Sequence, residues 1–141
     1  MQLKNVYEQI DALAPFALSK EYCDTYKFYD NSGVIVDCGG EVRGILCSLD
    51  LSMRAVEEAK KAGANVIVTH HPAIYQPVSS LKQDSAVLAC AQAGISVISA
   101  HLNLDSAAGG IDEELMLGLG GISGRSMHIL TDGSYGKAFA V

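Results

Sequence analysis

Four side chains with metal-binding chemistry lie in two short stretches of the sequence. His70 and His71 are adjacent and follow a run of strand-forming residues. His101 follows a second such run, and Asp105 comes four positions later. Imidazole and carboxylate groups without a thiolate suit Zn, Mn, Fe, Co or Ni and do not select among these metals. The sequence therefore predicts a site for a divalent metal ion at these residues.

The adjacent histidines pose a geometric question, because neighbouring residues in a regular strand point to opposite faces of a sheet. If the backbone turns at His70, both rings can serve one pocket, each binding a different ion of a two-metal centre about 3.5 to 4 Å across. The chain would then hold one or two ions.

Each candidate also has a structural interpretation that involves no metal. A histidine at a strand end often only satisfies a backbone carbonyl. Asp105 and His101 can be ligand and supporting group in either order, and Asp105 can instead be a helix N-cap or a turn residue. Asp50, which follows an earlier strand, can be a loop carboxylate without any role in the site.

The elements that position these residues alternate from residue 42 onward. We expect strands over residues 42–49, 65–69 and 96–100, and helices over residues 53–62 and 84–93. Ser52 and Asp84 would cap the helices, and a glycine closes each one. Two successive β-α-β crossovers make the three strands parallel, so the candidate donors share the edge formed by their carboxyl ends. The fold class is α/β, a parallel or mixed sheet of β-α-β units with helices on both faces.

The remaining segments give weaker patterns. They predict a helix over residues 2–13, a loop with room for a short helix over 17–29, a strand over 34–36 joined to 42–49 by a tight turn, a loop over 102–110, a helix over 111–119, and strands over 127–130 and 137–141. Residues 1–141 are expected to form a single α/β domain.

Composition excludes several classes of protein. The net charge is -6 with only ten Lys and Arg residues, which argues against a nucleic-acid partner. The first residues hold no apolar signal region, and no apolar run reaches about 18 residues, so we expect no membrane partner and a cytoplasmic location. The four cysteines form no C-x-x-C pair and are expected to be reduced thiols.

Several motifs together resemble one known family. They are Leu49-Asp50-Leu51, the segment from Ala64 through Thr69-His70-His71 to Pro72, Ala100-His101-Leu102-Asn103-Leu104-Asp105, Gly109-Gly110, and the early turn Asp30-Asn31-Ser32-Gly33. This order closely resembles the N-terminal half of the Ngg-interacting-factor-three-like family, the GTP cyclohydrolase I type 2 homologues.

The resemblance implies a two-domain α/β fold, a two-metal centre and a ring-shaped hexamer. By position, His70 and His71 resemble ligands to separate ions, Asp105 resembles a ligand partnering His71, and His101 lies near the site. The family's remaining ligands are a His and a Glu one helical turn apart in its C-terminal half. This chain has no such pair after Leu119, where His128 is the last histidine.

The resulting hypothesis is a metal-dependent hydrolase of the cyclohydrolase-like type. A metal-bound water would attack a nucleotide-like or other small heterocyclic or amide substrate, and His101 would be the catalytic proton shuttle. The alternative is a non-catalytic metal-binding, metal-handling or regulatory protein that uses the same site. A third interpretation is a scaffold that binds nothing.

Overall fold

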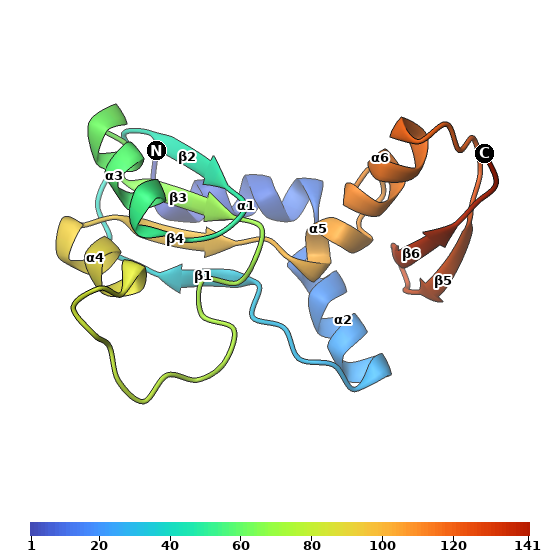
Figure 1. Cartoon of the computed structure of the whole chain (residues 1–141), viewed down its shortest axis with the longest axis horizontal. Helices are drawn as coiled ribbons and strands as arrows, with labels where there is room; N and C mark the ends of the chain where they lie inside the picture. Colours follow the sequence, from blue (N-terminus) through green and yellow to red (C-terminus); the bar gives the residue numbers. More distant parts are fainter.

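The computed structural model describes residues 1–141 as a four-stranded sheet flanked by helices, with a separate two-stranded hairpin (Figure 1). The elements are α1 (Leu3–Leu13), α2 (Phe16–Tyr26), β1 (Gly33–Val36), β2 (Ile45–Ser48), α3 (Met53–Ala62), β3 (Val66–Thr69), α4 (Ala86–Ala93), β4 (Ser96–Ser99), α5 (Leu102–Ser106), α6 (Ile111–Gly118), β5 (Arg125–Ile129) and β6 (Ser134–Ala138).

The strand order in the main sheet is β1-β4-β3-β2. As predicted, β2, β3 and β4 are parallel, and they are joined by the crossover helices α3 and α4. Both helices begin at a serine whose hydroxyl accepts a backbone N–H, and both end at a left-handed glycine. The cap of α4 is Ser85, one residue after the predicted Asp84. These local signals fix the crossovers, and the crossovers bring the three carboxyl ends to one edge.

The predicted tight turn between β1 and β2 is wrong. β1 pairs antiparallel with β4, so β1 and β2 lie at opposite edges of the sheet. The connecting segment runs past the amino ends of the inner strands (Figure 1). There the Asn65 side chain accepts from Arg43 N at 2.8 Å and donates to Glu41 O at 3.0 Å. The buried Asn65 side chain thus fixes the backbone of the connecting segment. A local turn motif does not predict this contact.

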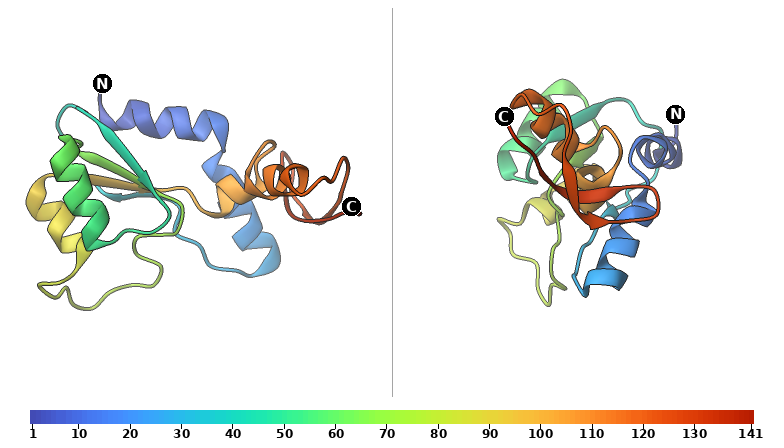
Figure 2. Two further views of the ribbon diagram at one scale, coloured as in Figure 1. Left: turned by 45° about the horizontal axis from the view of Figure 1, so that its top comes forward. Right: turned by 90° about the vertical axis from the view of Figure 1, so that its right-hand side faces the viewer.

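Helices cover both faces of the sheet, as predicted (Figure 2, left). One buried cluster lies between the sheet and helices α3 and α4: Val56, Ala59, Ala64, Ile67, Cys90, Ile95 and Val97. A second lies between the sheet and α1: Leu3, Val6, Val66 and Ile98. Successive side chains of β3 alternate between the clusters, so the strand is apolar throughout, as expected for a strand buried on both faces.

Two helices replace predicted loops. α2 occupies most of the segment predicted as a loop with room for a short helix, and α5 occupies the start of the predicted loop 102–110. Leu18 and Tyr22 of α2 pack on Leu102 of α5 and on Leu130, which lies between the two strands of the hairpin. These contacts join residues far apart in the sequence, which explains why the mixed charged and aromatic pattern of α2 did not predict its full length.

The predicted tail strands exist but with shifted bounds. β5 and β6 pair antiparallel with each other and do not join the main sheet. The hairpin lies beyond α5, at the end of the molecule away from α3 and α4 (Figure 1). Tyr22 Oη and His128 Nδ1 are 2.9 Å apart, a hydrogen bond that ties the hairpin to α2. None of the helices is both long and apolar enough to traverse a lipid bilayer.

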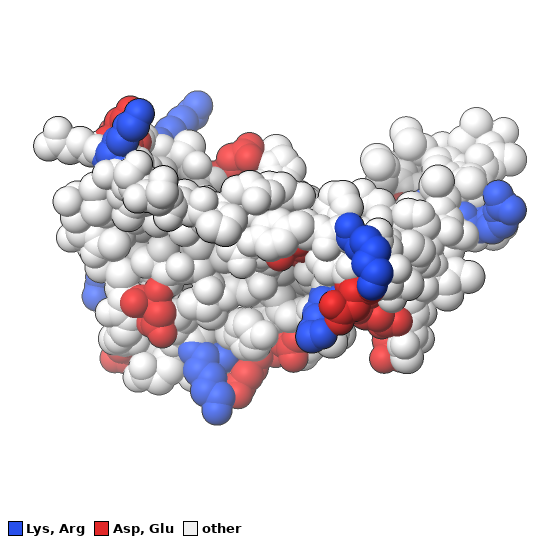
Figure 3. Space-filling model, turned by 90° about the horizontal axis from the view of Figure 1, so that it is seen from below, with Lys and Arg blue, Asp and Glu red and all other residues white.

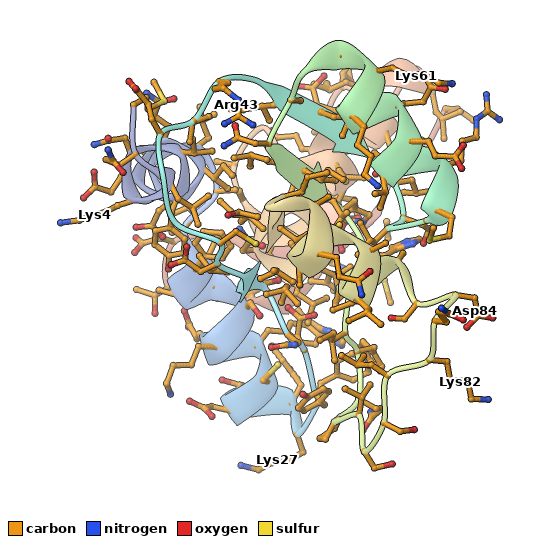
Figure 4. The ribbon with its side chains drawn as sticks, turned by 90° about the vertical axis from the view of Figure 1, so that its left-hand side faces the viewer. Lys4, Lys27, Arg43, Lys61, Lys82 and Asp84 are labelled. Atoms are coloured by element: carbon orange, nitrogen blue, oxygen red, sulfur yellow. The ribbon has the colours of Figure 1, made fainter.

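Charged side chains of opposite sign lie near one another. On the face shown in Figure 3, several basic and acidic groups touch each other, others stand alone, and large uncharged areas lie between them. Ion pairs one helical turn apart join Lys4 to Glu8 and Lys61 to Glu58. Figure 4, which looks at the amino ends of the parallel strands, shows Lys4 and Lys61 at the periphery. The absence of a nucleic-acid partner stays a prediction from the charge balance.

All four cysteines are free, and their exposure predicts different reactivities. Cys38 and Cys47 are exposed, whereas Cys90 is fully buried, and burial raises the pKa of its thiol to about 11. Because only the thiolate is nucleophilic, we expect iodoacetamide to modify Cys38 and Cys47 in the native protein and Cys90 only after denaturation. Peptide mass spectrometry over time measures this order. Modification of native Cys90 as fast as of Cys47 would contradict the packing of α4.

Candidate metal centre

The candidate residues lie at the carboxyl edge of the parallel strands. His70 and His71 follow β3, His101 follows β4, and Asp105 lies on α5, toward which β2, β3 and β4 point (Figure 1). Pairing with the neighbouring strand continues past the end of β3, because His70 N donates to Ser48 O at 3.1 Å and His71 N to Leu49 O at 2.9 Å. The backbone of both histidines is therefore anchored to the sheet.

The three histidine rings form one group. The ring centroids of His70 and His71 are 5.1 Å apart, those of His70 and His101 5.2 Å, and those of His71 and His101 5.9 Å. In a regular strand two adjacent side chains would lie on opposite faces of the sheet. The chain turns after β3, and this turn places both rings beside the same site.

His70, His101 and Asp105 form a group that could hold a metal ion. Their ligand atoms all lie within 4.8 Å of one another, and His70 Nε2 is 3.5 Å from Asp105 Oδ1. His71, also predicted as a ligand, lies beside this group, with about half of its side chain exposed. The structure thus brings all four predicted residues to one place, and the ligand atoms of His70, His101 and Asp105 form the compact group among them.

Each histidine has its Nδ1 within hydrogen-bond distance of an acceptor. The acceptors for His70, His71 and His101 are, in that order, Ala100 O at 3.0 Å, Asp50 Oδ1 at 2.7 Å and Asp30 Oδ1 at 2.7 Å. A carbonyl or carboxylate oxygen accepts, so Nδ1 carries the proton in each neutral ring and Nε2 keeps a free lone pair. Metal-binding histidines use this same arrangement, so the donor set fits a divalent ion.

Asp30 is the residue that sequence reasoning missed. Its carboxylate is fully buried and accepts hydrogen bonds from His101 Nδ1 and from the hydroxyls of Ser19 and Ser32, both at 2.6 Å. Burial alone would raise the pKa of Asp30, but these three hydrogen bonds outweigh it and hold the pKa at about 2. The sequence around Asp30 predicts only a turn, and no local pattern links this residue to a histidine 71 positions away.

Asp105 is a nearly buried carboxylate beside two imidazoles. Burial raises its pKa, while the neighbouring His70 and His101 act in the opposite direction. A buried carboxylate without a full positive partner is costly. A bound cation would supply that partner, which agrees with the free Nε2 atoms around it.

A hollow of about 390 Å³ adjoins the histidines. It is lined by Cys47, Ser48, Leu49, Val68, Thr69, His70, Ala100 and Leu104. The lining is mostly apolar, with the His70 imidazole as its most basic group. A small molecule held there would lie beside the candidate metal ligands.

Comparisons with known proteins all point to one family. A family model described as Duf34/NIF3 (NGG1p interacting factor 3) matches residues 1–135. A "GTP cyclohydrolase 1 type 2 homolog" of Clostridium perfringens is 31% identical over 125 residues, which cover 85% of this chain and 45% of that protein. One of Lactococcus lactis is 39% identical over 77 residues, covering 52% of this chain and 30% of that protein. The chain thus spans less than half the length of these relatives.

Solved structures share the fold. A Bacillus cereus protein related to NIF3 superposes with a TM-score of 0.78 at 27% identity, covering 89% of this chain and 34% of that one. Protein SA1388 of Staphylococcus aureus gives a TM-score of 0.78 at 29% identity, covering 92% of this chain and 42% of that one. Reduced HcgD from Methanocaldococcus jannaschii gives 0.77 at 25% identity, covering 91% of this chain and 50% of that one.

Proposed function

Because the chain belongs to the Duf34/NIF3 family, we propose that it is a metal-dependent hydrolase of the cyclohydrolase-like type. Its substrate would be a nucleotide-like or other small heterocyclic molecule. The observation that carries the proposal is the convergence of three Nδ1-anchored imidazoles and the Asp105 carboxylate at one sheet edge. When bound there, a divalent ion supplies a Lewis acid that activates water near neutral pH.

In this proposal His70, His71 and Asp105 hold one or two divalent ions, Zn, Mn, Fe, Co or Ni. His70 Nε2 and Asp105 Oδ1 are 3.5 Å apart, and the two side chains could hold one ion together. His71, whose Nδ1 lies 2.7 Å from Asp50 Oδ1, would supply its Nε2 to a second ion. The imidazole and carboxylate donors do not distinguish among these metals.

His101 is proposed as the catalytic proton carrier. The Asp30 carboxylate holds its Nδ1–H at 2.7 Å, which fixes the tautomer and strengthens Nε2 as a base. His101 Nε2 cannot bind an ion and a proton at once, so the proton role leaves metal binding to the other three residues. The adjoining hollow of about 390 Å³ suits a small ring, since ligand pockets begin at roughly 300 Å³.

Turnover by the zinc-loaded and manganese-loaded protein tests this function. The assay offers GTP, small heterocyclic amides and simple phosphoesters to wild type and to His101→Ala, with bound metal measured alongside. We expect metal-dependent turnover that falls at least about a hundredfold in His101→Ala while the metal is retained, the usual contribution of a positioned acid or base. Loss of the metal in this variant would make His101 a ligand and contradict the assigned role.

The alternative function is non-catalytic metal handling or regulation at the same site. The half-exposed His71 and the exposed Asp50 favour it, because an open site exchanges its ion readily. Stable metal binding without turnover of any substrate in the assay would support this alternative over hydrolysis.

We further propose that residues 1–141 form a single α/β domain equivalent to the N-terminal half of the two-domain family. The protein would be cytoplasmic. It would also form a homo-oligomer, which the family resemblance suggests is a hexamer. Exposed apolar side chains of the hairpin region support self-association, among them Ile122, Met127 and Ile129. Light scattering coupled to gel filtration measures the assembly. A monomer at high concentration would contradict it.

A further inference from the structure

Two buried hydroxyls lie at the ends of the strands that lead to His70 and His101. Thr69 is the last residue of β3 and Ser99 the last of β4, and the two are cross-strand partners in the parallel register. Both side chains are essentially inaccessible to solvent. Their oxygens are 2.9 Å apart. Because this hydroxyl pair cannot contact solvent, its hydrogen-bond partners must be groups of the protein.

The protons of this pair have only one consistent arrangement. Thr69 Oγ1 donates its single proton to the His71 carbonyl at 2.8 Å. Ser99 must therefore donate to Thr69, and Ser99 Oγ in turn accepts the Ala73 N–H at 3.0 Å. The result is a directed chain from Ala73 N–H through Ser99 and Thr69 to His71 O.

This chain of hydrogen bonds spans the turn that brings the histidines together. Its two ends, His71 O and Ala73 N, are the backbone groups on either side of Pro72, and both are pulled back onto the ends of β3 and β4. The adjacent strand-end residue Ala100 supplies the carbonyl that holds His70 Nδ1 and donates its own N–H to Thr69 O. The same two strand ends thus hold the His70 ring and the backbone that carries the His71 ring.

We propose that Thr69 and Ser99 are positioning residues that set the relative placement of the His70 and His71 imidazoles and thereby the metal affinity of the site. This inference rests on the proposed metal-binding function and assigns neither hydroxyl a direct contact with the ion. Groups that orient metal ligands typically change metal affinity about 10- to 100-fold when removed. Thr69→Val keeps the shape of the side chain but leaves the His71 carbonyl and the Ser99 proton without partners.

Zinc affinity, measured by competition with a chromophoric chelator, tests the inference. We expect Thr69→Val to bind Zn²⁺ at least about tenfold more weakly than wild type and Thr69→Ser to stay within about threefold, because serine restores the hydroxyl. Thr25→Val, at an exposed threonine of α2, is the matched control and should bind like wild type. The visible spectrum of the Co²⁺-loaded protein should also change in Thr69→Val and be restored in Thr69→Ser, which a loss of stability alone would not produce.

The outcomes separate the two proposals. Wild type that binds neither Zn²⁺ nor any of the other candidate metals overturns the metal-binding function itself. Wild type that binds Zn²⁺ no more tightly than Thr69→Val overturns only the positioning role. If Thr69→Val does not fold, Ser99→Ala interrupts the chain from its other end, and an affinity equal to that of wild type would then overturn the role.

Discussion

Replacing Asp105 by asparagine is expected to abolish tight zinc binding. The change removes the carboxylate charge and leaves the volume of the side chain almost unchanged, beside an imidazole whose Nε2 is 3.5 Å away. Loss of a ligand should exceed the effect of losing a group that only orients one, so we expect affinity for Zn²⁺ to fall more than about 100-fold. His70→Ala should have an effect of the same size. Isothermal titration of the metal-stripped protein measures both.

Asp84→Asn is the matched control for the charge change. Asp84 is exposed in the loop before α4 and lies at the periphery of the molecule (Figure 4). The net charge changes by the same amount as in Asp105→Asn, but far from the site. Equal zinc affinity in Asp105→Asn and Asp84→Asn would show that Asp105 is not a ligand.

Replacing Asp30 by alanine is expected to lower the free energy of unfolding by about 3 kcal/mol, the usual cost of breaking a buried charged network. The substitution leaves His101 Nδ1 and the hydroxyls of Ser19 and Ser32 without their acceptor in a region closed to solvent. Urea denaturation of the metal-free protein measures the change without any contribution from a bound ion.

Asp24→Ala provides the comparison for Asp30→Ala. Asp24 pairs with Lys20 on the surface of α2, with most of both side chains exposed. Such exposed pairs contribute little to the free energy of unfolding. If Asp30→Ala cost no more than Asp24→Ala, the buried network around His101 would be irrelevant to stability.

The β-α-β core could be predicted from sequence because its signals are local. Ser52 and the glycines after α3 and α4 mark helix ends within a few residues, and the apolar runs of β3 and β4 mark strands buried on both faces. Once the strands are parallel, His70, His71 and His101 must reach one edge. The grouping of candidate ligands therefore followed from short-range patterns alone.

The features that could not be predicted depend on contacts between distant residues. α2 is stabilised by Leu102 and by Leu130 between the hairpin strands, and β1 pairs with β4, which follows it by some sixty residues. Asp30 reaches His101 through tertiary packing only. The sequence leaves Asp50 open as a loop carboxylate or a donor, and the structure places its carboxylate 2.7 Å from His71 Nδ1. In each case the partner lies beyond the range of a local pattern.

The metal content of the wild-type chain tests most directly whether this sheet edge is a metal site. The measurement is elemental analysis after chelator stripping, reloading with Zn²⁺ and gel filtration. The convergence of His70, His71, His101 and Asp105 predicts one or two ions retained per chain. A folded chain that retains no zinc, nor any of the other candidate metals, would contradict the site.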